Sequence, residues 1–150
     1  MKYVRLLLWV VCCWSMTAVG SESVSVSDGY VQLPVPGQTR AAAFMVLQNE
    51  GESLTLASVS CSCASKVEIH SHTHSDGVMK MRREDALPLP SRQTVTLAPG
   101  GWHMMLFDLN PAVRSGQHVE LQLTYSDDSV QIIKLPVQSI FDGDDHQHHH

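Results

Sequence analysis

Short runs of alternating apolar and polar residues recur along most of this chain, and many of them are rich in valine, threonine and leucine. Gly, Pro, Asn, Asp and Ser separate these runs, and no long stretch repeats apolar residues every three or four positions as a helix requires. The pattern therefore predicts strands throughout. The nine predicted strands are 30–33, 42–48, 54–60, 66–72, 78–83, 94–97, 103–107, 118–125 and 130–137.

Turn-forming sequences connect the predicted strands. Ser75-Asp76-Gly77 and Pro99-Gly100-Gly101 are two of them, and both combine residues that favour tight backbone bends. Many short strands at regular spacing are typical of sandwiches and barrels. The sequence thus predicts an all-β fold, a Greek-key β-sandwich or barrel, and it shows no internal repeat.

The first twenty residues have the order of a secretory signal peptide. Basic Lys2 and Arg5 precede an apolar stretch at 6–14, and small residues lead up to Ser21. We therefore expect residues 1–20 to be removed and the mature protein to be exported.

A membrane anchor is not expected from the sequence. The apolar stretch near the start is too short to span a bilayer, and no later segment is apolar enough. Cys12 and Cys13 would suggest a lipoprotein, but Val10 and Val11 stand where lipoprotein cleavage needs a small residue.

The composition indicates one acidic domain. The 150 residues include 10 Lys and Arg against 15 Asp and Glu, and removal of 1–20, which hold two of the basic residues, takes the formal charge from −5 to −7. Such a chain has no electrostatic surface for nucleic acid. We place the domain at 21–141 and a polar tail at 142–150.

Cys61 and Cys63 are the two cysteines that follow the signal peptide, too few for a disulfide framework. Residues two apart on a strand lie near the upper end of disulfide distance. Three states remain open, ranked in this order: free buried thiols, a labile disulfide and an accessory Cu(I) site.

Four residues on three predicted strands form a candidate metal site. His70, Met81, His103 and Met105 supply two imidazoles and two thioethers, the ligands that a soft monovalent copper ion prefers. Zinc sites use thiolate, imidazole and carboxylate instead. Taken singly, a methionine is more often apolar filling and a histidine more often hydrogen-bonded, so the joint spacing carries the prediction.

Strand geometry indicates how the four side chains could meet. Alternate residues of a strand share a face, so His103 and Met105 point one way and Met104 points into the core. If the strands on either side of the turn at Asp76 form a hairpin, His70 and Met81 face each other across it.

The residues around the four candidate ligands resemble the PCuAC family of periplasmic copper chaperones. The similarity extends over 41–137. The matching segments are VEIH at 67–70, DGVMKMR at 76–82, LPLP at 87–90 and LAPGGWHMML at 97–106.

The resemblance implies a cupredoxin-like β-sandwich and a soluble periplasmic carrier of Cu(I). It also implies delivery of copper by ligand exchange toward the dinuclear copper centre of cytochrome c oxidase, in cooperation with Sco-type thiol proteins. We expect a monomer. Enzymatic activity is not expected, because no acid/base residue can be assigned near the histidines.

Further candidate donors surround the four ligands. Met79 is a spare thioether or, with higher weight, a packing residue, and His72 and His74 form an imidazole-rich Cu(II) site or a solvated strand end. The polar tail is either natural, which we favour, or an affinity tag, and such a tract can take up Cu(II). Its histidines are His146, His148, His149 and His150.

Three other functions remain open at this stage. Copper buffering for tolerance needs the same reversible site as delivery. An electron-transfer cupredoxin needs a cysteine thiolate beside two histidines, which the positions of Cys61 and Cys63 do not suggest. A copper or zinc enzyme built on His70, His72 and His74 needs an open metal position and an acid/base residue.

Overall fold

The computed structural model describes residues 23–75 and 77–140, and all the regular secondary structure in these residues is β-strand. The all-β prediction is confirmed, with ten strands where nine were expected. They are β1 (Val24–Gln32), β2 (Ala41–Asn49), β3 (Leu54–Ser60), β4 (Lys66–Ser75), β5 (Val78–Glu84), β6 (Leu87–Leu89), β7 (Thr94–Leu97), β8 (His103–Phe107), β9 (His118–Tyr125) and β10 (Val130–Gln138).

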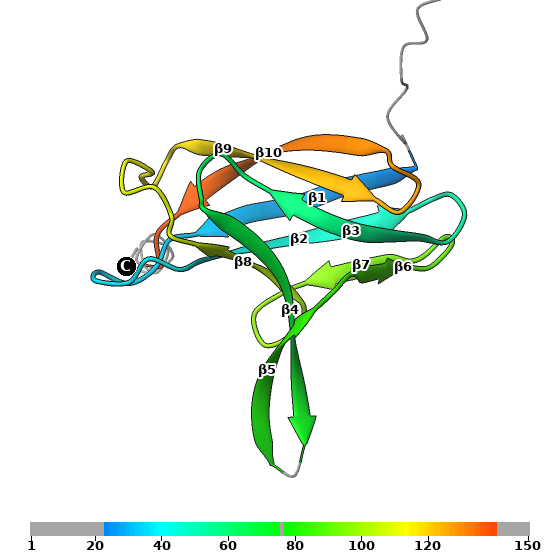
Figure 1. Cartoon of the computed structure of the whole chain (residues 1–150), viewed down its shortest axis with the longest axis horizontal. Coiled ribbons are helices and arrows are strands. Elements are labelled where there is room, and N and C mark those ends of the chain that lie inside the picture. Colours follow the sequence, from blue (N-terminus) through cyan, green and yellow to red (C-terminus); the bar gives the residue numbers. More distant parts are fainter. Residues whose placement is uncertain (1–22, 76, 141–150) are drawn as a thin grey trace, which may run out of the picture.

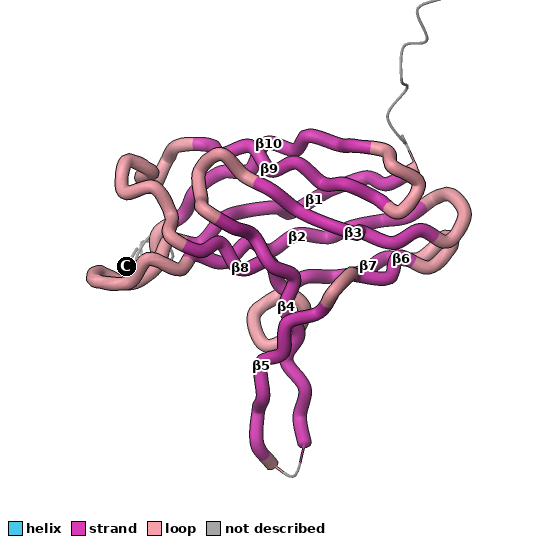
Figure 2. The backbone as a smooth tube through the Cα atoms, in the orientation of Figure 1, coloured by secondary structure: helices cyan, strands magenta, loops and turns pink. Residues whose placement is uncertain are grey.

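The strands form one continuous hydrogen-bonded path that folds into two layers (Figures 1 and 2). The order along the path is β5-β4-β8-β2-β1-β10-β9-β3-β6, and β7 pairs with β2 outside it. A parallel pairing of β1 with β10, in which Val31 lies opposite Val137, joins the layers. The architecture is a cupredoxin-like β-sandwich.

Alternation of side chains along the strands builds the core between the layers. In β9, Val119, Leu121, Leu123 and Tyr125 are buried and the residues between them are more exposed. β9 therefore buries one face and leaves the other in water. The register is strongly specified as a result, because a slip of one residue would expose the whole apolar set.

A bulge in β1 separates its two halves. The pairing with β2 shifts between Ser27 and Tyr30, and Asp28 has a φ of 51°. A Cβ on Gly29 would lie 2.5 Å from a methyl carbon of Leu135, so only glycine fits there without a shift of that side chain. The bulge explains why the sequence pattern predicted the strand only from Tyr30 onward.

The hairpin of β4 and β5 projects from the sandwich (Figure 1). The two strands are joined through Gly77, whose φ of 74° is one that glycine adopts readily. β5 is at one end of the strand path and pairs with β4 alone. Three large apolar side chains on it, Val78, Met79 and Met81, are exposed.

Several sequence predictions concern residues outside the described ranges. These are the signal peptide at 1–20 and the tail at 142–150 with His146, His148, His149 and His150. Among residues 23–75 and 77–140, no helix could cross a membrane.

Candidate metal site

The four predicted ligands lie on one face of three adjacent strands. In antiparallel pairs, residues directly opposite each other point to the same side of the sheet. His70 of β4 is opposite His103 of β8, and Met105 of β8 is opposite Glu68 of β4. Met81 of β5 is opposite His72 of β4. We call this surface the ligand face; its members are Glu68, His70, His72, Met79, Met81, Arg83, His103 and Met105.

The register of the β4–β5 hairpin differs from the predicted register by two residues. His70 was expected opposite Met81, whereas it pairs with Arg83 and Met81 pairs with His72. The cause is the tight connection, since Ser75 already pairs with Val78 and every later pair follows from that. Met81 therefore lies diagonal to His70 on the shared face.

His70 is a buried imidazole with one nitrogen unpaired. It is 8% exposed, and its Nε2 lies 2.9 Å from a carboxylate oxygen of Glu68. A carboxylate only accepts hydrogen bonds, so Nε2 carries the proton and donates it. In the neutral ring Nδ1 then keeps its lone pair, and this atom is buried without a hydrogen-bond partner. An orphaned, buried ring nitrogen of this kind is suited to a metal ion.

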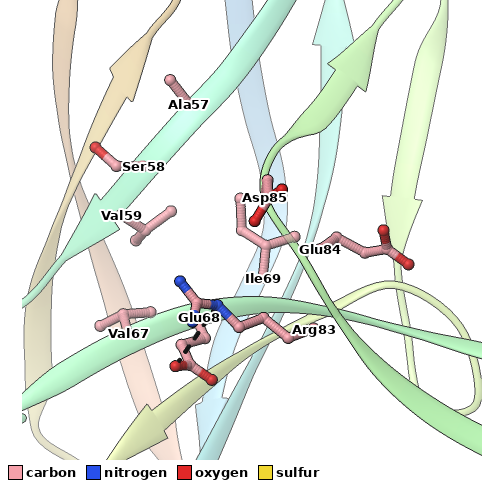
Figure 3. Close-up of a pocket in the computed structure, with 9 residues that line it drawn as sticks. All are labelled: Ala57, Ser58, Val59, Val67, Glu68, Ile69, Arg83, Glu84 and Asp85. Carbon is pink, nitrogen blue, oxygen red and sulfur yellow. Dashed lines mark ion pairs between the residues drawn. The ribbon is translucent and has the colours of Figure 1, made fainter.

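Glu68 holds His70 in this state and is itself held by two cations. The Lys66 ammonium lies 2.8 Å from one of its oxygens. The Arg83 guanidinium lies 3.7 Å from the same atom, and a dashed line marks this ion pair in Figure 3. The hydrogen bonds from Lys66 and then from His70 lower the pKa of Glu68 to about 2. It is therefore a carboxylate at any physiological pH.

His103 presents its other nitrogen. Its Nδ1 lies 3.1 Å from the carbonyl oxygen of Gly101, so Nδ1 donates and Nε2 keeps the lone pair. The side chain is 4% exposed. Burial, opposed by the bond to Gly101 and aided by His72 and His70, lowers the pKa of His103 below its ordinary value. The shift favours the neutral imidazole that metal ligation requires.

Aromatic rings surround the two buried histidines. The His70 and His103 rings have centroids 5.7 Å apart, and Phe107 lies 6.2 Å from His70. The Phe44 ring lies 6.4 Å from His103. These apolar neighbours reduce the access of water to the two imidazoles.

The two predicted methionine ligands, Met81 and Met105, differ in exposure. Met81, on the projecting hairpin, is 48% exposed, whereas Met105 on β8 is half-buried. Met104, between the two ligand positions of β8, is fully buried in the core, so that prediction is confirmed. The face thus offers one shielded and one open thioether.

The structure changes the interpretation of the further candidate donors Met79 and His72. Met79 is 54% exposed, so the packing role favoured for it was wrong. His72 is not a solvated strand end, because its ring stacks on His103 with centroids 5.0 Å apart and its Nδ1 is buried without a partner. For His74 the structure gives only its pairing with Met79.

The donor set can be tested against metal chemistry. In the described part of the chain, no three His, Cys, Asp or Glu side chains are arranged to hold an ion. The donors added by this face are the neutral sulfurs of Met81 and Met105, which suit Cu(I) far better than a hard divalent ion.

Cys61 and Cys63 form a disulfide, with Cα atoms 5.1 Å apart. The ranking that placed free thiols first was therefore wrong, and the accessory Cu(I) role for this pair has no thiolate to support it. The separation falls inside the usual disulfide range, because the pair lies in the loop after β3 rather than on a straight strand.

Sequence reasoning missed Glu68 as a partner of the site. The residue was visible in the VEIH segment, two positions before His70 and so on the same strand face. The Gly101 carbonyl could not have been found, because its direction depends on the turn before β8.

The chain was also compared with known proteins. A family model described as putative lipoprotein LpqE-like matches residues 24–137. A putative lipoprotein of Leifsonia xyli subsp. xyli is 28% identical over 118 residues, which cover 79% of this chain and 71% of the relative.

Two solved structures have the same fold. The copper-bound PCuAC domain from PmoF2 has a TM-score of 0.65 and 26% identity, covering 78% of this chain and 93% of that domain. The Cu(I) form of DR1885 from Deinococcus radiodurans has a TM-score of 0.66 and 25% identity, covering 81% of each chain. Since the family model extends over nearly the whole described sandwich, this chain belongs to the LpqE-like family and has the fold of PCuAC domains.

Proposed function

We propose that this protein is a copper chaperone that binds one Cu(I) ion through His70, Met81, His103 and Met105. The observation that carries the proposal is the register of β4, β5 and β8, which gathers these four residues on one face. The copper-bound PCuAC domain and the Cu(I) form of DR1885 support it, because both are copper-bound proteins of this fold.

The unequal exposure of the donors suits a carrier. His70 and His103 are 8% and 4% exposed and act as buried anchors, whereas Met81 is open to an incoming donor. An acceptor displaces Met81 first and Met105 second, so that copper is shared between the two proteins during transfer. Neutral thioethers hold the ion weakly enough for this exchange, and no covalent step is involved.

The protein is proposed to act outside the cytoplasm. The relatives are named as putative lipoproteins, which are exported proteins, and the signal-like residues 1–20 agree with that. We propose the periplasm as the compartment. A Sco-type protein or the copper subunit of cytochrome c oxidase is the proposed exchange partner, following the PCuAC resemblance.

X-ray absorption of the Cu(I)-loaded full chain tests the ligand set. The wild type is expected to show mixed nitrogen and sulfur scattering. Met81→Ala and Met105→Ala should each lose sulfur scattering, whereas the matched control Met79→Ala should not. A Cys12→Ser/Cys13→Ser/Cys61→Ser/Cys63→Ser background removes the four cysteine sulfurs of the full chain, so that the remaining sulfur scattering comes from methionine. Sulfur scattering that persists undiminished in both variants would exclude the two methionines.

A further inference from the structure

The disulfide between Cys61 and Cys63 contributes little to holding the fold together. It closes a loop of only three residues, so it restricts the unfolded chain far less than a bond between distant segments. Both cysteines belong to the same connection between β3 and β4, so no separate elements are tied. A structural role therefore does not account for the bond.

The two cysteines differ in burial. Cys63 is 8% exposed and packs in the core cluster, whereas Cys61 is half-buried and lies in the wall of a surface groove. The backbone N–H of Cys63 also donates to the sulfur of Cys61 at 3.1 Å. An accessible first cysteine that receives a backbone hydrogen bond, beside a shielded second one, is the asymmetry that directed thiol exchange requires.

A shallow groove beside Cys61 has room for a side chain of a docked protein. Its volume is about 170 Å³, and it runs over the outer side of β3, β9 and β10. Ser60 is opposite Gln122, and Gln122 is opposite Ile132, so these three side chains form one row across the strands. Ile132 is 66% exposed, an apolar contact flanked by hydrogen-bonding groups.

We propose that Cys61–Cys63 is a thiol–disulfide exchange centre that reacts with a cysteine pair on a partner protein docked in this groove. A thiolate of the partner attacks the sulfur of Cys61, the bond to Cys63 breaks, and Cys63 leaves as a thiolate that takes up a proton. The second partner thiolate then attacks the mixed disulfide and releases Cys61. The partner loses two electrons and becomes a disulfide, while Cys61 and Cys63 become thiols.

This activity is separate from the proposed copper function. The pair lies before β4 begins at Lys66, at the end of the strand away from the hairpin and its open thioether (Figure 1). Replacing the cysteines should therefore leave copper binding intact. The Cys61→Ser/Cys63→Ser variant with unchanged copper stoichiometry keeps a failure of this inference distinct from a failure of the copper proposal.

The first test uses full chain carrying Cys12→Ser and Cys13→Ser, so that Cys61 and Cys63 are its only thiols. We expect glutathione buffers to reduce the pair, whereas structural disulfides resist them. After addition of Cys63→Ser, the remaining Cys61 should react with 5,5′-dithiobis(2-nitrobenzoate) at least about tenfold faster than Cys63 does in the Cys61→Ser chain. A pair that stays oxidised in glutathione, or equal rates in the two variants, would overturn the proposal.

The second test addresses the groove. The probe is a reduced synthetic peptide with a Cys-Xaa-Xaa-Cys pair, and its oxidation by the disulfide form is followed by mass spectrometry. Ile132→Glu should slow this oxidation about tenfold, because it places a charge on the apolar contact. The matched control is Val130→Glu, also exposed on β10 but outside the groove lining. Equal slowing by both variants would contradict docking at the groove.

Discussion

The imidazole rings of His72 and His103 stack with their centroids 5.0 Å apart, although only His103 belongs to the predicted ligand set. His72 also lies directly opposite Met81, and its Nδ1 is buried without a partner. The ligand face thus holds a third imidazole within reach of the site. Its nitrogen is a harder donor than a thioether, so its contribution should depend on the oxidation state of copper.

His72→Phe tests this dependence, since phenylalanine keeps an aromatic ring while removing both nitrogens. We expect Cu(I) affinity to change by less than about threefold and Cu(II) affinity to fall by about tenfold or more, because thioethers bind Cu(II) poorly. Competition with chromophoric chelators measures both affinities. A large loss of Cu(I) affinity would instead make His72 one of the Cu(I) ligands.

Glu68 should act on copper through His70. Glu68→Ala removes the acceptor that keeps the proton of His70 on Nε2, and outer partners of this kind are worth about tenfold or more in metal affinity. Glu68→Gln retains an oxygen acceptor and should recover part of the loss. Nitrogen-15 NMR of the His70 ring reports the tautomer in each variant.

The matched control for Glu68 is Glu84→Ala. Glu84 is a carboxylate on β5 that accepts a hydrogen bond from Ser71 at 2.6 Å, and its register partner is Ile69, a residue of the core side. Copper affinity in this variant should stay within about twofold of wild type. If both alanine variants weaken copper binding equally, the effect is one of general charge rather than of His70.

The stability of the fold should depend on alkaline pH through Tyr125. Burial, with a smaller contribution from Asp127, raises the pKa of Tyr125 to about 12, and its hydroxyl donates to Gln131 at 2.7 Å. A raised pKa means that the stabilisation is complete below about pH 10 and is lost as pH rises toward 12. The loss amounts to at most roughly 3 kcal/mol.

Urea unfolding at a series of pH values from about 9 to about 12 measures this loss, because that interval includes the ordinary and the raised pKa of Tyr125. Tyr125→Phe lacks the titrating group, so its free energy of unfolding should fall less steeply over the same interval. Parallel pH curves for the two proteins would show that other groups cause the alkaline loss.

Asn49 should be a main polar stabiliser of the core. It is fully buried, and its amide nitrogen donates to the carbonyl oxygens of Leu89 and Glu52, each at 2.8 Å. Its own oxygen accepts from the N–H of Gly51. Asn49→Ala leaves these buried groups unpaired and should lower the free energy of unfolding by about 2–4 kcal/mol. Gln48→Ala, at an exposed neighbouring position, should cost less than about 1 kcal/mol.

Much of the architecture could be predicted because side-chain alternation is a local property. The bounds of β3, β7, β8 and β9 agree with the predicted strands. β6 was not predicted; it is three residues long and contains Pro88, which lacks an N–H. It pairs only with β3 at the end of the strand path, where a proline is tolerated.

The candidate site was predictable in composition but less so in pairing. That His70, His103 and Met105 share a face follows from strand periodicity and the order of the strands. The partner of Met81 does not, because it depends on how many residues form the connection at Gly77. The Cys61–Cys63 bond was likewise misjudged because straight-strand spacing was assumed where the chain forms a loop.

The parallel pairing of β1 with β10 fixes where the first and last strands of the domain end. β1 begins at Val24, whose strand partner is Asn49, and it ends where Gln32 is opposite Gln138 near the end of β10. The hairpin of β4 and β5 projects away from both of these ends (Figure 1). A surface or a fused protein that contacts the domain at either end of β1 would therefore leave the β4–β5 hairpin uncovered.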